Sequence, residues 1–489
     1  MKLSKAIKIT ALLLTLAQLA VITACGGSDV PATTDGTTDA SEATTIADNT
    51  TASLPEKDME GFALRISSVD PAELSWSNIA IVADEQNGDL LSDALYRRNS
   101  WLEETYNFQF EVTERANKSN MYSEVLAGDD LYDIYMIYDI QTASVIKACR
   151  SWNDLPYVDL TQAWWNPSAT ELFCIDGNQL LTAGDMTLTY ISRAMCYLFN
   201  KEIYADMQKS ENLYELAAEG KWTADRFFAL AAEAVRDLNG DQVYNENDQY
   251  GVFGNPRAYY NTLMEGAGFK YVDRDENGTY TFGLHQNEAA INWIEKIVAF
   301  EAVNPNLSYN TGTLVYEIKP DTLFASGQAL FHIQAMPHTI EQLRSMEDEF
   351  GILPLPKADE KQENYISPAY GGLLTALPKT LPEERLENVG MLLEAMTRMT
   401  YHDILPTYKE VLLKTKYSRD DESSAMLDII FSEISFDPGI VLWCSNISDA
   451  ICADIFMTGN SAVVSYLTQR APIFQQYLDA FNNVFDEGE

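Results

Sequence analysis

The sequence predicts an α/β protein with two lobes, each built from its own strands and helices. Apolar runs of strand length alternate with amphipathic helical stretches on both sides of residues 181–202, as in folds that layer helices on sheets. Within this stretch, Met195–Phe199 suits a buried strand and Asn200 then begins a helix. The 46% hydrophobic and 11% aromatic content supports a sizeable core, and the length suits two or three compact domains. Residues 181–202 are therefore expected to form the first crossing between the lobes.

The N-terminus has the pattern of a secretory signal. Residues 1–24 combine three lysines with an apolar run from Ile9 to Val21 that is too short for a stable membrane span. The stretch Ile-Thr-Ala-Cys-Gly at 22–26 resembles a bacterial lipobox, so Cys25 is the expected lipidation site. An ordinary cleavage site with an incidental cysteine is the alternative. The mature protein is then expected on the outer face of the cytoplasmic membrane, in a Gram-positive cell, held there by lipid such as palmitate alone.

Residues 25–57 are expected to form a flexible tether behind the lipidated cysteine. They are dominated by Thr, Ala, Asp, Ser and Gly without apolar periodicity, so they bury too little surface to offset their ordering entropy. A chain of about 30 residues has a root-mean-square reach of roughly 30 Å, which keeps a domain close to a membrane partner. An enzyme or an adhesin can use the same kind of tether.

Charge and cysteine content narrow the classes of partner. The formal net charge of −40 repels nucleic acid and anionic lipid surfaces and disfavours polyanionic ligands, but not neutral or cationic ones. Five of the six cysteines remain once Cys25 is assigned to lipid, and their irregular spacing argues against a disulfide framework. Most are expected to be buried as small apolar side chains, with one or two disulfides left open. A monomer is expected.

The first lobe begins as strand, helix, strand. Phe62–Ile66 and Phe108–Val112 alternate apolar and polar residues, and Leu91–Tyr106 places leucines on one helical face. A further strand is expected to end at Tyr138. The carboxyl ends of strands line the ligand crevice in open parallel sheets, so Tyr138 and Asp139 become candidate ligand contacts. Tyr138 as a core aromatic is the alternative.

The second lobe is expected to contain a helix from Thr223, a strand at Tyr250–Phe253 and a helix at Ala289–Phe300. The apolar run Leu323–Gln334 is expected to return the chain to the first lobe, and the sequence from Glu383 onward is mainly helical. These boundaries assign residues 58–182 and 326–376 to lobe I, and residues 183–325 and 377–489 to lobe II.

Several short phrases resemble the extracellular solute-binding proteins of family 1, the sugar receptors of bacterial ABC importers. They are Ala-Gly-Asp at 127–129, Trp-Trp-Asn at 164–166, Phe-Asn-Lys-Glu-Ile at 199–203, Phe-Ala-Ser-Gly-Gln-Ala-Leu at 324–330 and Ile-Leu-Pro-Leu-Pro at 352–356. The order of these phrases along the chain supports the resemblance more strongly than any single phrase does. The resemblance spans about Phe62 to Phe485 and implies a type II periplasmic-binding-protein-like fold with a ligand cleft between the lobes. It also implies delivery of a carbohydrate, most often an oligosaccharide, to ABC permease subunits.

The resemblance and the strand ends together nominate ligand-binding residues. Arg257, Tyr259 and Tyr260 follow a strand whose equivalent in the maltodextrin-binding proteins carries sugar contacts, and Trp443 resembles that family's stacking tryptophan. Aromatic faces pack well on the C–H faces of sugar rings, although each of these aromatics has a core role as its alternative. The complete set of candidates is Tyr138, Asp139, Trp165, Asp185, Arg257, Tyr259, Tyr260, Gln334, Tyr370 and Trp443.

Residues 237–248 have the spacing of a calcium-binding loop. A twelve-residue loop supplies oxygen ligands from positions 1, 3, 5, 7, 9 and 12, which here are Asp237, Asn239, Asp241, Val243, Asn245 and Asp248. The loop departs from the EF-hand at position 6, where Gln242 replaces glycine, and at position 12, where aspartate replaces glutamate as in dockerin loops. A structural Ca²⁺ bracing the second lobe is expected, and an acidic turn without metal is the alternative.

Enzyme classes are disfavoured by missing motifs. The sequence has no G-x-S-x-G, H-E-x-x-H, P-loop or G-x-G-x-x-G, although composition does not exclude a pair of glycosidase carboxylates. A calcium-dependent adhesin would not need two crossings. We therefore expect a non-catalytic, lipid-anchored solute receptor of an ABC transporter. A receptor for peptides or polyamines and a secreted carbohydrate-active enzyme are the alternatives.

Overall fold

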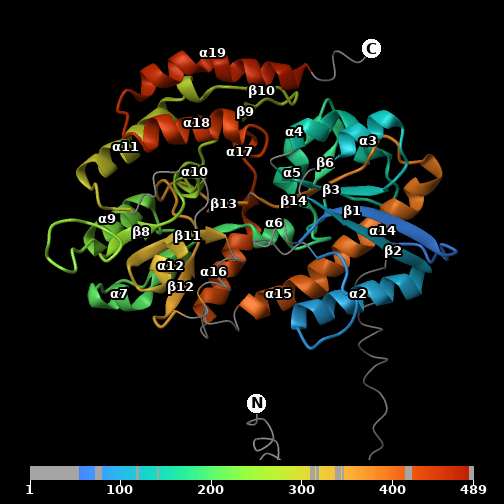
Figure 1. Cartoon of the computed structure of the whole chain (residues 1–489), viewed down its shortest axis with the longest axis horizontal. Helices are drawn as coiled ribbons and strands as arrows, with labels where there is room; N and C mark the ends of the chain where they lie inside the picture. The colour runs from blue at the N-terminus through green and yellow to red at the C-terminus, as the bar shows by residue number, and fades with distance from the viewer. Residues whose placement is uncertain are drawn as a thin grey trace, which may run out of the picture. The chain divides into compact units, whose positions relative to one another are not determined.

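A computed structural model describes most of the chain from residue 54 onward. The described residues are 54–71, 80–116, 120–139, 142–308, 314, 319–335, 343, 346–369, 371–412 and 421–483. The expected signal, Cys25 and nearly all of the tether lie outside them, as does Tyr370. Figure 1 shows the described elements with the labels used below.

The first sheet confirms the strands expected before residue 182. It runs in the order β2-β1-β3-β14-β6. β1 lies parallel to β2 and β3, and β14 lies antiparallel to both β3 and β6. The strands of this sheet are β1 (Phe62–Val69), β2 (Phe108–Arg115), β3 (Ile134–Tyr138), β6 (Leu181–Thr182) and β14 (Leu373–Ala376).

Helices from both ends of the chain cover the first sheet. α2 packs against β2 and against α14 and α15 from the C-terminal part, while α5 packs against β6. A π-helical turn, Thr400–Ile404, joins α14 to α15. The helices of this lobe are α2 (Leu90–Tyr106), α3 (Met121–Ala127), α4 (Thr142–Val145), α5 (Pro167–Leu172), α14 (Leu386–Met399) and α15 (Leu405–Leu412).

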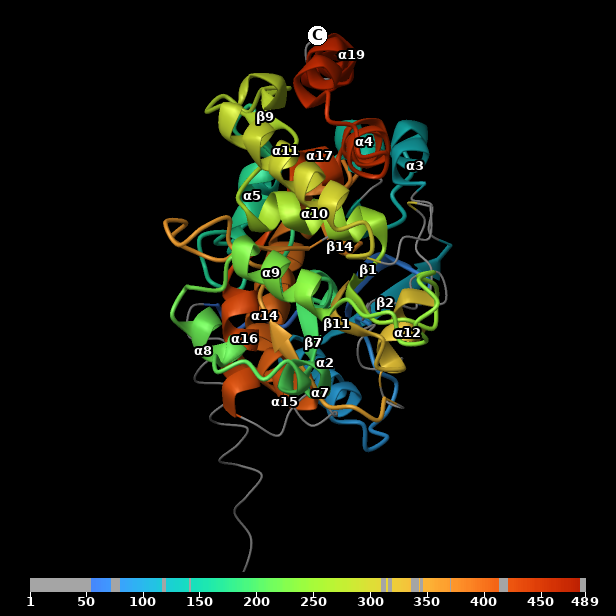
Figure 2. The ribbon, with the colours of Figure 1, turned by 90° about the vertical axis from the view of Figure 1, so that its left-hand side faces the viewer.

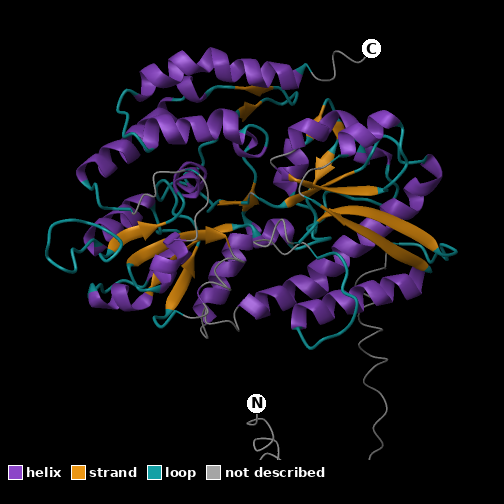
Figure 3. Cartoon of the chain, viewed as in Figure 1, coloured by secondary structure: helices purple, strands orange, loops and turns teal. Residues whose placement is uncertain are grey.

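The second sheet has the order β12-β7-β11-β8 and is buried throughout its strands. Its central strands are antiparallel, with Phe331 opposite Phe199, and β8 joins β11 in parallel. Figure 3 shows the two groups of strands as separate sheets within the helices. The strands of the second sheet are β7 (Met195–Asn200), β8 (Tyr250–Phe253), β11 (Ala329–Ala335) and β12 (Phe350–Leu353).

The helices of the second lobe lie on its sheet and in layers beyond it. α9 packs on β8 and β11, α16 packs on β12, and α19 packs on α11 and the β9–β10 hairpin (Asp273–Arg274 and Tyr280–Thr281). Figure 2 shows α9, α10 and α11 in successive layers, with α19 beyond them. The bounds are α7 (Lys201–Asp206), α8 (Leu213–Ala218), α9 (Ala224–Ala234), α10 (Pro256–Gly266), α11 (Glu288–Val303), α12 (Lys319–Ala325), α16 (Asp421–Ser432), α17 (Pro438–Val441), α18 (Asp449–Ile451) and α19 (Val463–Asn482).

The expected lobe boundaries need correction after residue 325. The assignment of 326–376 to the first lobe is wrong for β11 and β12, because both pair with β7 of the second sheet. The chain returns only between β12 and β14. A strand buried along its whole length, as β11 is, shows no alternating pattern that identifies its sheet. The assignment of 377–489 to the second lobe is also wrong for α14 and α15, which pack on α2.

Three segments lie side by side by hydrogen bonding at the junction of the lobes. Ala194, just before β7, pairs antiparallel with Ala369. β13 (Ser367–Pro368) pairs in parallel with β15 (Ile434–Ser435), and the Ala369 amide donates to the Ser435 carbonyl at 3.0 Å. We call these three segments, at residues 194, 367–369 and 433–435, the junction ribbon. Ala194 of the ribbon and α6 (Thr189–Ser192) both lie within the first crossing predicted at 181–202.

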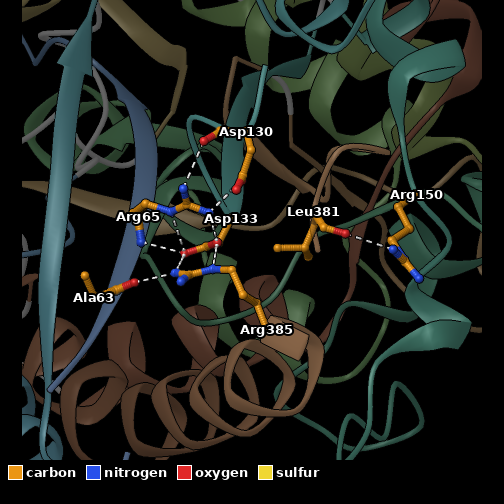
Figure 4. A network of polar contacts seen from close by, with 7 residues as sticks. All are labelled: Ala63, Arg65, Asp130, Asp133, Arg150, Leu381 and Arg385. Atoms are coloured by element: carbon orange, nitrogen blue, oxygen red, sulfur yellow. Dashed lines mark hydrogen bonds and ion pairs between the residues drawn. The ribbon is translucent and has the colours of Figure 1, made fainter. Parts of the chain in front are cut away.

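A buried carboxylate joins the C-terminal passage to the first sheet. Asp133 precedes β3 and is fully buried. Its carboxylate accepts hydrogen bonds from Arg385 Nε at 2.6 Å and Nη2 at 2.7 Å, and from Arg65 Nη2 at 2.7 Å and the Arg65 amide at 2.9 Å. Arg385 also donates to the Ala63 carbonyl, and Asp130 takes a second contact from Arg65 (Figure 4). One carboxylate therefore links β1, the start of β3 and the residue before α14.

A second buried charge holds the first lobe together. Arg98 of α2 is 2% exposed and uses its guanidinium to bond Asn99 Oδ1, the Ile81 and Met186 carbonyls and Thr400 Oγ1, all at 2.6–2.9 Å. Burial lowers its pKa to about 9. Because every N–H has an acceptor, the guanidinium is held without a carboxylate.

Two further properties of the described part concern its cysteines and its helices. Cys149, Cys174, Cys196, Cys444 and Cys452 are all free thiols. The disulfides left open from the sequence are therefore absent from these five residues. Among the described helices, none has both the length and the apolar character needed to span a membrane.

Replacing Asp133 tests the linkage described above. Asp133→Ala leaves two guanidinium groups facing each other, and we expect the free energy of unfolding to fall by about 3 kcal/mol. This value is at the lower end for a broken buried pair, because both arginines are partly exposed. The control is Asp130→Ala, which removes a 43% exposed carboxylate from Arg65 and is expected to cost under about 1 kcal/mol. Urea unfolding of both variants measures this, and equal small losses would contradict the linkage.

Candidate functional site

The end of β3 meets a glycine turn that precedes β14. Asp139 is 1% exposed, and its carboxylate accepts hydrogen bonds from the amides of Gly371 at 2.5 Å and Gly372 at 3.3 Å. Gly371 has φ +85°, and a Cβ there would lie 3.1 Å from Nε of Arg193. This position therefore requires glycine both for its backbone and for the approach of Arg193. Asp139 lies at the end of β3 as expected, its carboxylate is used within the protein, and its role as a ligand contact stays a prediction.

The second lobe contributes an ion pair at the N-terminus of α10. Arg257 lies in the first turn of α10, after the capping residue Asn255. Its Nε and Nη2 contact Asp449 Oδ1 and Oδ2 at 2.7 and 2.6 Å, a two-point pairing that fixes both planes. The Arg257 side chain keeps 38% of its surface exposed and that of Asp449 keeps 14%. Both ends of the pair therefore retain hydrogen-bonding capacity for a ligand.

Electrostatic coupling places these groups in one neighbourhood. Burial raises the pKa of the Tyr138 hydroxyl, and the positive charges of Arg193 and Arg257 act on the same hydroxyl in the opposite direction. Burial raises the pKa of the Cys444 thiol to about 11, helped by Asp449 and opposed by Arg257. We call this group the interlobe cluster; its members are Tyr138, Asp139, Arg193, Arg257, Cys444 and Asp449.

The interlobe cluster suits binding rather than covalent chemistry. A thiol whose pKa is raised to about 11 stays protonated at neutral pH and is a poor nucleophile. The cluster offers guanidinium and hydroxyl donors beside carboxylate acceptors, from both lobes. Because donors and acceptors of opposite charge lie together, such an arrangement can form hydrogen bonds with an uncharged polar solute.

Two tryptophans predicted to meet the ligand are core residues instead. Trp443 is 5% exposed and packs edge-on against Tyr280 at 5.1 Å and Phe481 at 5.3 Å. Trp165 is 2% exposed and packs edge-on against Trp152 at 5.5 Å. Its indole N–H donates to Glu394 at 3.0 Å. The stacking role is therefore wrong for both, because their rings are almost completely buried against other aromatic side chains.

The tyrosines after Arg257 are also buried. Tyr259 and Tyr260 are 3% and 4% exposed, and Tyr260 stacks on Phe456 at 4.6 Å and donates to Glu301 at 3.0 Å. α10 begins at Pro256, so successive side chains point around a helix, and only Arg257 keeps a free surface here. Of the three ligand contacts predicted here, Arg257, Tyr259 and Tyr260, only Arg257 remains a candidate.

Asp185 and Gln334 are buried in separate polar networks. Asp185 is 1% exposed and accepts a short hydrogen bond from the Tyr190 hydroxyl. Gln334 is 7% exposed, and its amide donates to Asp321 at 2.9 Å, which also contacts His332 at 2.8 Å. Both side chains are used within the protein, so the structure does not support them as ligand contacts. The predicted contact at Tyr370 lies outside the described residues.

The proposed calcium loop has an unusual backbone conformation. Gln242 at position 6 has φ +64°, in the left-handed region that a calcium loop usually fills with glycine. Asp237 accepts the amides of Gly240 and Gln242 at 2.6 and 2.7 Å. Asp248 is fully buried and accepts the amides of Leu238 and Asn245. In the described part of the chain, no three His, Cys, Asp or Glu side chains lie close enough to share a metal ion.

Sequence reasoning missed three members of the cluster: Arg193, Cys444 and Asp449. Arg193 carried a usable signal, since it is the single charged residue between Asp185 and Lys201, and a lone charge in an apolar crossing points to a specific role. Asp449 and Cys444 carried no such signal. Acidic residues are abundant in this sequence, and Asp449 contacts Arg257 across a separation of 192 residues.

The comparisons with known proteins concern the fold. No protein-family model matches the sequence, and a search of curated proteins gave no match. Among solved structures, the chain is similar to the galacto-N-biose-/lacto-N-biose I-binding protein of the ABC transporter from Bifidobacterium longum, in complex with lacto-N-biose. The identity is 13% and the TM-score 0.53, over 87% of this chain and 98% of that chain.

Two further structures give the same result. The cyclic α-maltosyl-1,6-maltose binding protein from Arthrobacter globiformis has 12% identity and a TM-score of 0.53, over 88% of this chain and all of that chain. Maltose-bound MalE3 of T. maritima has 13% identity and a TM-score of 0.51, over 85% and 100%. The two-lobed α/β fold expected from the sequence is thereby confirmed.

The titration of Asp185 gives a test of its burial. Desolvation raises the pKa of Asp185 to about 7, against about 3.9 in an unfolded chain. The folded state therefore favours the protonated form, so this contribution to stability is complete below pH 4 and is lost as pH rises through about 7. We expect Asp185→Asn to gain stability relative to the native protein across that window, at up to about 1.4 kcal/mol per pH unit.

Urea midpoints from pH 4.5 to 8 measure this difference. Asp206→Asn, at an exposed position of α7, is the control and is expected to follow the native protein at every pH. A constant offset between Asp185→Asn and the native protein would mean that Asp185 titrates as an exposed carboxyl.

Proposed function

We propose that this chain is the solute receptor of an ABC transporter and that it binds a carbohydrate, most simply an oligosaccharide, between its lobes. The observation that supports the proposal most directly is the interlobe cluster, in which charged groups from the first crossing, α10 and α18 act on the pKa of Tyr138 or of Cys444. The three similar structures bind sugars according to their descriptions, and the interlobe cluster offers the paired donors and acceptors that sugar hydroxyls need.

The proposal includes a place in the cell and a partner. The lipobox at Cys25 and the tether behind it support a receptor anchored by lipid outside the cytoplasmic membrane, where it passes its solute to permease subunits. The proposal also holds that the protein is not an enzyme. Its similar structures are described as binding proteins, and the Cys444 thiol of the cluster is held protonated.

A glycan panel tests the proposed function. A ligand at 100 times its dissociation constant stabilises a folded protein by about 2.7 kcal/mol, which is readable as a rise in melting temperature. We expect a rise with one or more neutral oligosaccharides and no release of reducing ends. Release of reducing ends would move the protein to the carbohydrate-active enzymes. A response to polyamines or peptides with silence across all glycans would identify another solute class.

Protein variants, tested with the ligand found in this way, distinguish residues of the binding site from residues of the core. We expect Arg257→Ala to weaken binding by about 2 kcal/mol or more, because it removes a desolvated donor and leaves Asp449 unpaired. Arg226→Ala is the matched control, since Arg226 also pairs with a carboxylate and is 39% exposed. Trp443→Ala is expected to lower the free energy of unfolding by about 3–5 kcal/mol instead. Calorimetric titration and urea unfolding of each variant measure both quantities, and normal binding by Arg257→Ala would remove it from the site.

We also propose that the loop 237–248 binds Ca²⁺ and braces the second lobe. The left-handed backbone at Gln242 supports the proposal, since this strained conformation already matches position 6 of a calcium loop. The carboxylates now accept hydrogen bonds from loop amides, so the side chains of Asp241 and Asp248 must turn toward Asp237 to share an ion. This rearrangement opposes binding and makes a modest affinity the expectation.

Calcium addition and removal test the loop. We expect Ca²⁺ to raise the melting temperature of the protein, EDTA to lower it, and Asp241→Ala to remove the difference, because clustered carboxylates repel one another until a cation joins them. Asn247→Ala, at a loop position that supplies no ligand, is the control and is expected to respond like the native protein. Unchanged melting after EDTA, with metal removal confirmed by elemental analysis, would leave an acidic turn.

A further inference from the structure

A groove on the second lobe lies apart from the interlobe cluster and shares no residue with it. It runs between the C-terminal end of α8, the segment 357–365 and the C-terminal end of α16, and has a volume of about 740 Å³. This volume is in the range of small-molecule sites. The neutral part of its lining includes Ala217, Ala218, Tyr365 and Ile429.

A buried lysine faces this groove. Lys357 is 3% exposed, and its ammonium donates one hydrogen bond, to the Gln362 carbonyl at 2.9 Å. The ammonium lies 5.3 Å from the centre of the Tyr365 ring. Gly220, with φ +71°, leaves room for the ammonium beside it, because a Cβ there would lie 3.1 Å from Lys357 Nζ. Two of the three ammonium donors thus have no hydrogen-bond acceptor among the described residues.

Burial without a carboxylate partner among the described residues distinguishes Lys357 from the other described lysines. Within the described part of the chain, six lysines pair with a carboxylate at 2.6–3.1 Å: Lys57, Lys209, Lys221, Lys296, Lys319 and Lys409. All six are more exposed than Lys357, the one buried lysine in that part. The chain has 73 acidic residues against 33 basic ones, so acidic side chains that could pair with a lysine are abundant. Burying an ammonium without a counter-charge costs free energy unless a group from outside the protein pairs with it.

The rim of the groove limits the charge of that outside group. Glu360, Glu363 and Glu433 line the rim, and Glu219 there already pairs with Lys221 at 2.7 Å. A polyanion would meet repulsion from these carboxylates. A single carboxylate meets less of this repulsion than a polyanion, and Tyr365 and Ile429 line the same groove with apolar surface.

We propose that this groove binds a small organic acid through a single carboxylate held by Lys357. Lys357 backbone contacts make the arrangement rigid: its amide donates to the Trp222 carbonyl at 3.1 Å, and its carbonyl accepts the Ala224 amide at 2.8 Å. These contacts fix the backbone, and burial of the side chain together with the hydrogen bond to the Gln362 carbonyl restricts the ammonium, which lowers the ordering cost of binding. The site is independent of the solute proposed for the interlobe cluster.

Thermal unfolding in sodium propionate, against sodium chloride at equal ionic strength, tests the site. We expect propionate to raise the melting temperature in a saturable manner for the native protein. Lys357→Met keeps the length of the side chain without its charge and is expected to weaken this response at least about ten-fold. Lys361→Met, an exposed lysine on the same groove, is the control and is expected to respond like the native protein.

A second measurement on the native protein decides the matter even if Lys357→Met fails to fold. Reductive methylation followed by peptide mass spectrometry gives the labelling rate of each lysine. We expect propionate to slow the labelling of Lys357 and to leave that of Lys361 unchanged. Equal labelling of Lys357 with and without propionate, an equal thermal response in Lys357→Met, or a stronger response to inorganic phosphate than to propionate would each overturn the proposal.

Discussion

The contact of Asp133 with Arg65 and Arg385 closes the first lobe, and the rest of the architecture depends on that closure. The chain leaves this lobe after β6, forms most of the second lobe, and returns through β14 to α14. Arg385 stands at the start of that last passage, 252 residues from Asp133. Ordering so long a loop has an entropic cost that local contacts cannot offset. A buried carboxylate shared by two guanidinium groups gives the returning chain one position beside β1 and β3.

The interlobe cluster follows from where this closure puts β14. β14 pairs with β3, so the glycine turn before β14 reaches the Asp139 carboxylate at the end of β3. Arg193 approaches that turn because Gly371 has no side chain. On the other side, the Arg257–Asp449 pair is completed within the second lobe. Each half is therefore satisfied by its own lobe, and under the proposed function a solute between them would meet groups that are already oriented.

The sequence allowed prediction of local elements better than of which lobe or surface they serve. β1 and β2 had clear periodicity, β7 was recognisable as a short apolar run, and the place of Asp139 at a strand end followed from the predicted strand. β11 is buried on both faces, so its composition did not say which sheet it joins. Trp165 and Trp443 show the same limit for side chains, since an indole suits a core and a sugar face equally well. Asp449 depended on a contact across 192 residues, which no local pattern reports.

The junction ribbon has a mechanical consequence. Its three segments are linked edge to edge by the Ala194–Ala369 bridge and the pairing of β13 with β15. Sliding one segment along its neighbour by a residue would break these hydrogen bonds, whereas bending all three together would keep them. The ribbon thus behaves as a flexure that is stiff to shear and compliant in one direction, as in hinge motions carried by a few residues. Any movement between the lobes that preserves these hydrogen bonds would therefore bend the three segments together and keep their register.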